Sequence, residues 1–514
     1  MNNIEVCQNR IISQDYPDPD VIRVDDTYYM VSTTMYYFPG AAILRSYNLV
    51  NWEIVSYVFE ELDGTKEERL EDNKNLYGHG MWAPSFRYHN GKFYIAFVSH
   101  EQEDTHLFIA DKVEGPWEHR MIKGYYHDCS LLFDEDSIFI VHGNMNIHLT
   151  ELADDLSGPK NGGIDKIIIE DDPNRVRLGY EGSHFYKINN KYLITLIHCP
   201  TDGMRTESVF VSDRVDGEYI GKDVLSDDGG YLNQGIAQGG IVDTPDGKWY
   251  AILFQDSGAV GRIPSLMPIE WKDGFPVFGN DGKATRNFTV TDYRPDYKYE
   301  SLINSSIAKK SLDNKQYIIT PQWQWNHIPN KKLVEIKDER SIRVETGKLS
   351  VNPMHAINTL THRTTYPSGS ARISLDYSGL KIGDTAGLIV LIGQYAMAGV
   401  RRYKDGFHKV LIVSNHKHEG FGIGLNDYEE ARIIIDEIID NPDCKCNIEA
   451  LTCFENMKDE VRFFIDDKEI TKEAIKIEFK LDLFTGARIG MCIYSQKEIG
   501  GVAEFRVESI LTNE

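Results

Sequence analysis

Residues 82–99 read WAPSFRYHNGKFYIAFVS, and this stretch decides how the first half of the chain folds. Apolar and polar residues alternate on both sides of His89-Asn90-Gly91, whose residues are typical of tight turns. The second half of the stretch is rich in aromatic side chains. The pattern therefore predicts an antiparallel hairpin.

The same design occurs four more times in the first 290 residues. The other copies are 17–34 (PDPDVIRVDDTYYMVSTT), 127–143 (HDCSLLFDEDSIFIVHG), 180–197 (YEGSHFYKINNKYLITLI) and 238–254 (QGGIVDTPDGKWYAILF). Units of roughly 45 to 65 residues with several strands each are typical of propeller blades. A solenoid is the alternative, but blades vary this much in length when their loops gather on one face of a closed ring. We expect an all-β fold that begins with a five-bladed β-propeller.

Aligning the units brings three carboxylates into register. One aromatic residue in each second strand marks equivalent positions: Tyr29, Tyr94, Phe139, Tyr192 and Tyr250. Eleven residues before these marks lie Asp18, Ala83, Asp128, Glu181 and Gly239. The innermost strand of every blade starts at the central axis on one face, so equivalent positions converge there. Asp18, Asp128 and Glu181 should therefore point into one shared depression.

Carboxylates that share a depression shift one another's pKa values. Such a group suits acid/base chemistry in which one carboxyl stays protonated and another stays ionised near neutral pH. Asp and Glu also cap turns where strands begin, which is the simpler explanation for any single one of them. Three in the same phase favour the catalytic interpretation.

Composition narrows the classes of partner. The chain of 514 residues carries a formal net charge of −24, so nucleic-acid and membrane-surface roles are not expected. The first residues lack a basic stretch followed by an apolar one, so we expect no secretory signal and a cytoplasmic protein. Seven cysteines fit free thiols in a reducing compartment. Cys444-Lys-Cys446 with Cys453 matches no common zinc spacing, so no metal site is expected.

Several short motifs together resemble a known family. They are Tyr16-Pro-Asp18-Pro-Asp20, Met81-Trp-Ala-Pro84, His127-Asp128, Tyr180-Glu181-Gly182 and a last-blade stretch from Gln238 to Gly279. In this order and spacing they resemble glycoside hydrolase family 43, the five-bladed propeller family of β-xylosidases, α-L-arabinofuranosidases and arabinanases. The resemblance implies a catalytic propeller over residues 1–295. It also implies an appended concanavalin-like β-sandwich over 300–514, where Trp323-Gln-Trp-Asn326 is among the best matches.

The resemblance also implies roles for individual residues. Asp18 matches the family's general base, Glu181 its general acid, and Asp128 the carboxylate that tunes the acid's pKa and orients the sugar. Arg262 matches an arginine that touches the sugar, and Trp82 an aromatic residue of the pocket wall. The implied mechanism is hydrolysis by single displacement, with inversion at the anomeric carbon.

The chain departs from the family pattern near the axis. Many relatives carry a histidine in the fifth blade that is linked to a central ion or water, whereas this chain has Gln238 or Gly239 there. We therefore expect no required cofactor, with a structural calcium ion at the axis as the alternative. Four further pocket-wall candidates are His127, Tyr36, Phe38 and His79, although aromatic side chains serve core packing equally well.

The C-terminal half consists of alternating runs with turn signals about every ten residues, which fits an antiparallel sandwich. Gly422-Ile-Gly424 is too short, and lacks the strand–turn–helix context, for a nucleotide-binding loop. The resemblance implies that one sandwich loop leans over the propeller and closes the pocket. Closure favours an exo-acting enzyme that releases xylose or arabinofuranose from neutral oligosaccharides. A non-catalytic sugar-binding propeller and an endo-acting arabinanase are the alternative functions. The sequence leaves open whether the protein forms a homo-oligomer.

Overall fold

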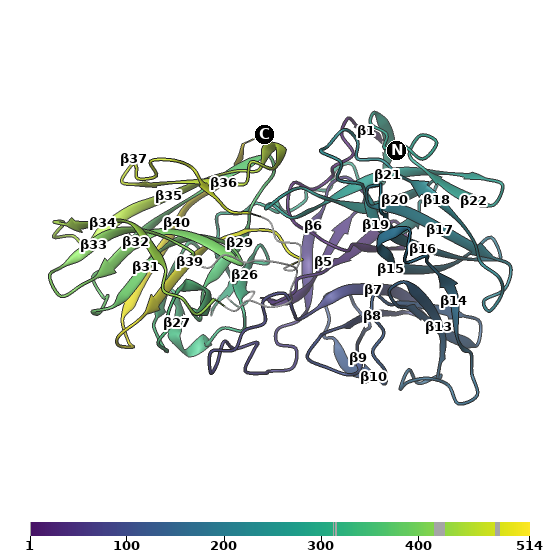
Figure 1. The fold of residues 1–514 in the computed structure, drawn as a ribbon, viewed down its shortest axis with the longest axis horizontal. Helices are drawn as coiled ribbons and strands as arrows, with labels where there is room; N and C mark the ends of the chain where they lie inside the picture. Colours follow the sequence, from purple (N-terminus) through teal and green to yellow (C-terminus); the bar gives the residue numbers. More distant parts are fainter. Residues whose placement is uncertain (1, 312, 314–315, 416–426, 479–483, 514) are drawn as a thin grey trace.

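The computed structural model describes residues 2–311, 313, 316–415, 427–478 and 484–513. Nearly all of the regular secondary structure in these residues is β-strand, and it forms two sets of antiparallel sheets that lie side by side in Figure 1. The prediction for Gly422-Ile-Gly424 falls outside the described residues. None of the helices in the described ranges is long and apolar enough to cross a membrane.

Five four-stranded sheets form the blades of a propeller. The first comprises β2 (Asp20–Val24), β3 (Thr27–Ser32), β5 (Gly40–Ser46) and β6 (Glu53–Phe59). The second comprises β7 (Trp82–His89), β8 (Lys92–Val98), β9 (Thr105–Ala110) and β10 (Glu118–Ile122). The third comprises β11 (Ser130–Asp134), β12 (Ser137–His142), β13 (Asn146–Leu152) and β14 (Asp165–Glu170).

The last two blades follow the same plan. The fourth comprises β15 (Val176–Ile188), β16 (Lys191–Pro200), β17 (Thr206–Ser212) and β18 (Ile220–Leu225). The fifth comprises β19 (Ala237–Asp243), β20 (Trp249–Asp256), β21 (Arg262–Lys272) and β22 (Phe275–Phe278). Every predicted hairpin forms the first two strands of its blade, which confirms the five-bladed propeller.

The ring closes between the fifth and first blades. The innermost strands contact one another around the axis, and β19 contacts β2 to complete the circle. The backbone N–H of Gly240 donates to the carbonyl of Pro19 at 3.0 Å across this seam. Outside the ring, β1 (Asn2–Val6) pairs with β23 (Phe288–Asp292), so the start of the chain is tied to the segment after the last blade.

Two large sheets form the sandwich. One has the order β34 (Arg432–Ile439), β33 (Phe407–Val413), β32 (Gln394–Arg402), β31 (Asp384–Ile392), β39 (Arg488–Ser495), β29 (Leu360–Arg363), β26 (Trp323–Asn326) and β4 (Tyr37–Phe38). The other has the order β27 (Val334–Ile336), β28 (Ser341–Glu345), β40 (Val502–Asn513), β30 (Ser368–Asp376), β35 (Lys445–Cys453), β36 (Glu460–Ile465) and β37 (Lys468–Glu469). The remaining elements are β24 (Ala308–Lys310), β25 (Tyr317–Ile319), β38 (Ile475–Lys476) and three short 3₁₀ helices, Lys331–Leu333, Pro353–His355 and Glu455–Met457.

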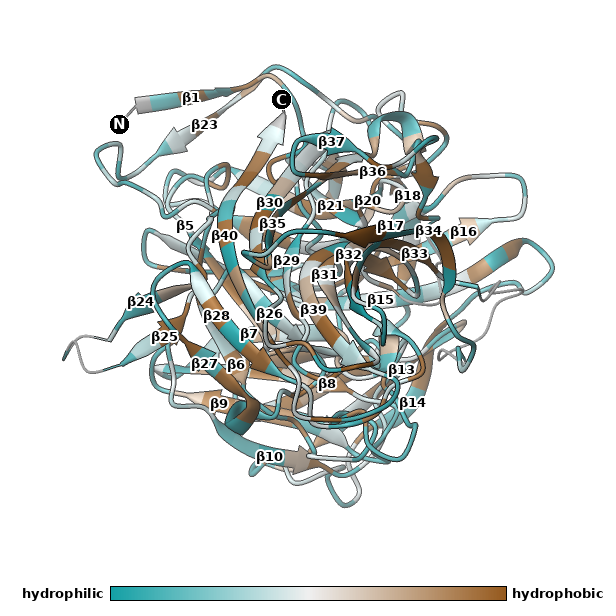
Figure 2. Cartoon of the chain, turned by 90° about the vertical axis from the view of Figure 1, so that its left-hand side faces the viewer, coloured by the Kyte–Doolittle hydropathy of each residue, from teal (hydrophilic) through white to brown (hydrophobic). Residues whose placement is uncertain are grey.

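Alternating burial explains why these strands stack as layers. In β30 and β35 every second residue is buried, so each strand turns one face to the core. Figure 2 shows hydrophobic stretches along the sandwich strands and hydrophilic residues along many of the connecting loops. A β-sandwich is thereby confirmed as the second part of the fold.

The two parts of the chain share a sheet. Strand β4 lies between two strands of the first blade in sequence, yet it pairs with β26 at the edge of a sandwich sheet. Phe38 is the partner of Trp325 in this pairing, and Tyr37 is the partner of Asn326. The first blade therefore supplies backbone hydrogen bonds to the sandwich and helps to fix its position beside the propeller.

Candidate active site at the propeller axis

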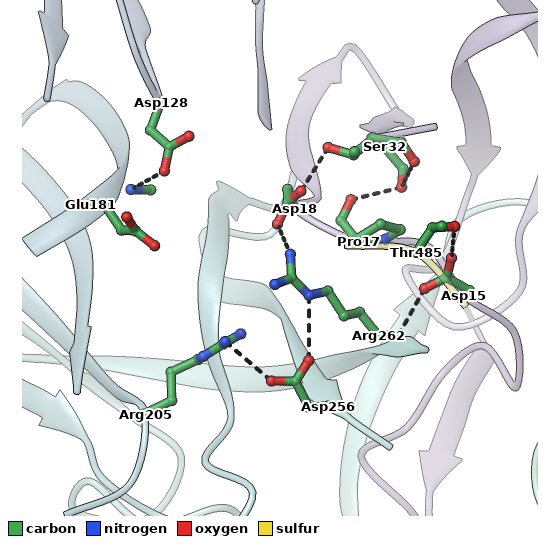
Figure 3. Close-up of polar contacts among 12 residues, drawn as sticks. Asp15, Pro17, Asp18, Ser32, Asp128, Glu181, Arg205, Asp256, Arg262 and Thr485 are labelled. Carbon is green, nitrogen blue, oxygen red and sulfur yellow. Dashed lines mark hydrogen bonds and ion pairs between the residues drawn. The ribbon is translucent and has the colours of Figure 1, made fainter. Parts of the chain in front are cut away.

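The structure brings Asp18, Asp128 and Glu181 together at the axis of the propeller. Asp18 and Asp128 line the same cavity of about 10 Å³, the space for about one water molecule. Glu181 precedes Gly182, whose N–H donates to Asp128 Oδ2 at 3.0 Å. In Figure 3 the three carboxyl groups, which belong to separate blades, face a common space. Acidic groups from three blades therefore meet at one point.

Counting back eleven residues reaches the equivalent blade position at Asp18 and Asp128. In the fourth blade it reaches Glu181, one residue before the equivalent position. The backbone takes the left-handed conformation at one position at each blade's start: Asp18, Ala83, Asp128, Gly182 and Gln238. The count starts from one aromatic residue in the second strand of each blade. In the first three blades this residue, Tyr29, Tyr94 or Phe139, lies two positions after the first paired residue of that strand. Tyr192 lies only one residue after it, so counting back reaches Glu181 instead of Gly182. Glu181 reaches the axis from the preceding position because β15 contains several register shifts.

Asp18 is held by one cation and one hydroxyl. Thr33 Oγ1 donates to its Oδ2 at 2.7 Å, and Arg262 Nη1 donates to its Oδ1 at 2.9 Å. The neighbouring turn is fixed because Ser32 Oγ and Thr33 N both donate to the carbonyl of Pro17. Burial raises the pKa of Asp18 above its ordinary value, and Arg262 and Thr33 oppose this rise by favouring the ionised form. The ion pair favours the ionised form of Asp18 and orients its carboxyl toward the axis.

Glu181 has the opposite electrostatic setting. Burial and the negative charge of Asp128 raise the pKa of Glu181 to about 7, while His127 lies close enough to oppose the rise. His127 Nε2 is 3.7 Å from Asp128 Oδ1 and 4.0 Å from Glu181 Oε2. Asn144 Nδ2 donates a hydrogen bond to Glu181 Oε2. A carboxyl that keeps its proton near neutral pH is the form that a general acid needs.

Two cations share one carboxylate below the site. Arg262 Nε lies 3.3 Å from Asp256 Oδ1, and Arg205 Nη2 lies 3.1 Å from Asp256 Oδ2. Both guanidinium groups also stack over Phe254. Nη1 of Arg205 is buried without a hydrogen-bond partner. Its charge lowers the pKa of Asp18 and of Glu181, so Arg205 acts on both carboxyls.

Sequence reasoning missed Asn144 and Arg205. Asn144 follows β12 in a loop, and Arg205 lies in the turn before β17, outside every repeated hairpin. Neither residue belongs to a short motif that marks it in a single sequence. Only the closure of the ring places them beside Glu181 and Asp256.

Three of the predicted wall residues belong to a series of rings that begins with His127, beside Glu181. The Trp82 ring is 6.0 Å from that of His127 and 4.1 Å from that of His100, measured between centroids. His79 lies farther out: its ring is 5.1 Å from that of His100, and its Nδ1 is 3.0 Å from Glu101 Oε1. The half-buried rings of His127, Trp82 and His79, with the exposed ring of His100, form an aromatic wall that leads outward from Glu181.

The sandwich contributes one ring to this wall. Phe484, just before β39, lies 4.9 Å from Trp82 between ring centroids, and the Arg262 guanidinium lies 5.4 Å from the same ring. The expected loop from the sandwich therefore meets the pocket at Phe484. The residue is 466 positions away from Asp18 in sequence, so no local pattern links the two.

The predicted roles of Tyr36 and Phe38 in sugar binding are wrong. Their side chains are 0% and 1% exposed, because both pack in the core between the first blade and the sandwich. Tyr36 packs against Tyr77 and His327, and Phe38 packs against Phe59. The sequence shows that aromatic residues cluster here, but the cluster serves strand β4 and its pairing with the sandwich.

Among the described residues, the axis offers few free oxygen donors for a calcium ion. Calcium binds six to eight oxygen ligands. Here Asp18 is paired with Arg262, Asp128 accepts the N–H of Gly182, and the lining also includes the imidazole of His184, which faces Asp20. His127, Asp128 and Glu181 offer atoms within 4.8 Å of one another, but one of the three is the acid that must hold a proton. We derive no step through a metal.

Comparisons with known proteins agree with this arrangement. A model of Glycosyl hydrolases family 43 matches residues 7–276, more than half of the chain. A model of the Beta xylosidase C-terminal Concanavalin A-like domain matches residues 314–508.

Individual relatives point the same way. A beta-xylosidase of Formosa agariphila is 26% identical over 82% of this chain and 79% of its own length. A non-reducing end alpha-L-arabinofuranosidase of Bacteroides ovatus is 28% identical over 56% of this chain and 57% of its own length. The solved structure of a bifunctional GH43-CE protein of Bacteroides eggerthii superposes with a TM-score of 0.86 and 34% identity, covering 98% of this chain and 64% of that one. The chain spans only part of the last two proteins. By its propeller, its axial carboxyl groups and the match over its first half, the chain belongs to family 43 of the glycosyl hydrolases.

Proposed function

We propose that this glycoside hydrolase is an exo-acting, inverting enzyme that removes a terminal pentose, β-D-xylose or α-L-arabinofuranose, from short neutral oligosaccharides. Relatives with both printed activities, a beta-xylosidase and an alpha-L-arabinofuranosidase, support the choice of a pentose. Phe484, which covers one side of the pocket, supports exo action because a covered pocket accepts a chain end more readily than a chain interior.

The proposed reaction is a single displacement. Asp18 takes a proton from a water molecule while the oxygen of that water forms a bond to the anomeric carbon. The bond from the same carbon to the glycosidic oxygen breaks, and Glu181 gives its proton to the departing oxygen. The sugar leaves with inverted configuration. Exchange with solvent then returns the proton to Glu181 and removes it from Asp18.

One observation carries this proposal. Two carboxyl groups at the same axis lie in opposite electrostatic settings: Asp18 is paired with Arg262, and Glu181 lies beside Asp128 with a pKa of about 7. The cation favours the ionised form of Asp18 and the like charge favours the protonated form of Glu181, which is the difference that a base and an acid need.

The direct test is a small panel of aryl pentosides, with the product anomer followed by proton NMR during the first turnovers. We expect cleavage of a β-D-xyloside or an α-L-arabinofuranoside, and a product that first appears with the inverted configuration. A product that first appears with retained configuration would reject the assignment of Asp18 as the base for water. Failure to cleave any pentoside would reject the proposed substrate class.

We further propose a cytoplasmic protein whose parts are residues 1–295 and 300–514. All seven cysteines are unpaired, and Cys129, Cys446 and Cys492 are buried, which supports a reducing compartment. Fractionation of the native host, followed by detection of the full-length chain, tests this location. Independent expression of the two residue ranges tests the division.

A further inference from the structure

One buried carboxylate joins the propeller to the sandwich directly beneath the site. Asp15 is 1% exposed and lies three residues before Asp18. Its Oδ1 accepts the backbone N–H of Arg262 at 2.8 Å. Its Oδ2 accepts the hydroxyl of Thr485 at 3.0 Å and the backbone N–H of Gly486 at 2.7 Å (Figure 3). Both oxygens are therefore used, one toward each part of the fold.

The backbones around Asp15 are packed without spare room. A Cβ on Gly261 would lie 2.2 Å from Asp15 Oδ1 and 2.7 Å from the Cα of Gly486. A Cβ on Gly486 would lie 2.1 Å from the carbonyl oxygen of Val260. These distances are shorter than any ordinary contact, so the two glycines allow the close approach. The position of the sandwich backbone is fixed here to within a small tolerance.

The same contacts fix two groups that face the pocket. Phe484 is the neighbour of Thr485, and its ring packs on Trp82 at 4.9 Å. Arg262, held by its N–H, extends its guanidinium to Asp18 at 2.9 Å. Misplacing either group by about 1 Å would be expected to cost up to about 100-fold in rate, because reacting groups must be held in near-attack geometry.

Asp15 cannot be replaced by a group that both donates and accepts. The N–H groups of Arg262 and Gly486 only donate, and they approach opposite oxygens of the carboxylate. The charge of Asp15 also acts on the buried guanidinium groups of Arg363 and Arg488 nearby. An asparagine would turn its NH₂ toward one of the two N–H donors and would lose one side of the junction.

We propose that Asp15 is a positioning residue for the pentose pocket: it does not touch the sugar, and it acts by holding Phe484 of the sandwich and Arg262 of the fifth blade in one fixed relation to Asp18. This inference rests on the proposed glycosidase function. It extends that function by making the sandwich a part of the active site that one carboxylate couples to the base.

The test uses the full chain and a matched pair of variants at Thr485. Thr485→Val removes one hydrogen bond to Asp15 and keeps the volume, whereas Thr485→Ser keeps the hydroxyl. We expect Thr485→Val to raise KM for the best aryl pentoside about threefold to tenfold, with a smaller change in kcat, because the lost bond acts on the sugar only through Phe484. Thr485→Ser should behave as the natural protein does. Equal kinetics in both variants would overturn the proposal.

A double-mutant cycle separates positioning from general stability. If the bond from Thr485 acts through Phe484, then Thr485→Val in a Phe484→Ala background should add less than a twofold change, because the ring that it positions is gone. Full additivity would show that the bond does not act through the ring. Asp459→Asn is the control at the same junction. Asp459 accepts the N–H of Ala259 at 2.8 Å and contacts neither Phe484 nor the Arg262 side chain, so KM should change less than twofold.

Hydrogen exchange gives a readout that needs no substrate. In Asp15→Asn, the amides of Arg262 and Gly486 should exchange at least about tenfold faster than in the natural protein, because one of the two loses its acceptor. Peptides from β35 should exchange unchanged. Unchanged exchange at both amides would overturn the proposal even if the protein cleaved no pentoside. Faster exchange without any pentosidase activity would instead reject the proposed function alone.

Discussion

Buried carboxylates occur both at the propeller axis and at the junction with the sandwich, and they differ in what faces them. At the axis, Asp18 faces the side chain of Arg262, and Glu181 faces Asp128 and His127. At the junction, Asp15 and Asp459 accept backbone N–H groups that cannot move. The axial groups can exchange protons with a bound molecule, whereas both oxygens of Asp15 accept hydrogen bonds from the protein. The partners of a carboxyl, more than its burial, decide whether it does chemistry or holds the fold.

The largest effect is expected from replacing Asp18, the proposed base at the axis. We expect Asp18→Asn to lower kcat by about a thousandfold or more on every substrate, because an amide cannot accept the proton of the attacking water. Steady-state assays on the pentoside panel measure this loss, and circular dichroism checks that the variant is folded. If activity stays within tenfold of the natural protein, the base must be assigned to another residue.

Removal of the acid should have a large effect that depends on the leaving group. We expect Glu181→Ala to lower kcat by about 100-fold to 10,000-fold on oligosaccharides, whose leaving alcohols need protonation. The loss should be much smaller on aryl glycosides with acidic phenols, since these depart without a proton. A Brønsted plot over a phenol series measures the difference. Equal losses on both classes of substrate would remove Glu181 from the acid role.

Arg205 should have an intermediate effect. Arg205→Met keeps much of the apolar length and removes the charge and the unpaired Nη1. We expect kcat/KM to fall about 10-fold to 100-fold, the range for losing one hydrogen bond to a charged group near a substrate. Leu232 projects from a neighbouring loop and is exposed, so Leu232→Ala serves as a surface control. Unchanged kcat/KM in Arg205→Met would place Arg205 outside the site.

The pH dependence of kcat/KM tests whether the neighbours of Glu181 set its pKa as described. Glu181 must be protonated to act, and its pKa in the folded protein is about 7, so kcat/KM should fall as the pH rises through about 7. Asp128→Asn removes the like charge that helps to raise this pKa, and the alkaline limb should then move to lower pH. Arg205→Met removes a charge that lowers the pKa, and the limb should move to higher pH. Shifts in the reverse directions would contradict the assignment.

The smallest effect is expected at the junction and concerns stability. Burial raises the pKa of Asp459 from 3.8 to about 6, so the unfolded chain loses this proton at lower pH than the folded chain does. The folded state is therefore penalised progressively between about pH 4 and pH 6. Asp459→Asn still offers an oxygen to Ala259 and avoids the penalty, so it should raise the free energy of unfolding at pH 7 by about 1–3 kcal/mol. Thermal melts at pH 7 and pH 4 test this, and the gain should vanish at pH 4.

Much of the propeller could be predicted because the signals that form each blade's first hairpin lie close together in the sequence. A hairpin needs only an alternating pattern and a turn, and both lie within about 18 residues, as in 82–99. Repetition then predicts the ring and the convergence of Asp18 and Asp128. In the fourth blade the count reaches the residue before the equivalent position. Tyr192 is the second paired residue of its strand, where the marker residues of the first three blades are the third, and β15 changes register. The count still selected the residue that reaches the axis, and the motif Tyr180-Glu181-Gly182 selects the same one.

The errors and omissions have one physical origin. Tyr36 and Phe38 look like sugar-binding residues until β4 is seen to pair with β26, far along the chain. Aromatic side chains suit a buried core and a sugar face equally well, so a pattern alone cannot separate the two uses. Phe484 and Arg205 were missed because their neighbours in space are distant in sequence.

The sequence by itself determined the repeated hairpins, the five-bladed ring, the alternating strands of the sandwich and the acidic residues that the blades bring to the axis. These features follow from hydrophobic periodicity and turn chemistry, which act over short stretches of chain. The tertiary structure alone decided the partners of each carboxyl. Asp18 pairs with a cation, Glu181 lies beside another acid, and Asp15 binds backbone N–H groups at the junction. Those outcomes depend on charges, donors and burial supplied by residues hundreds of positions away, and no local pattern encodes them.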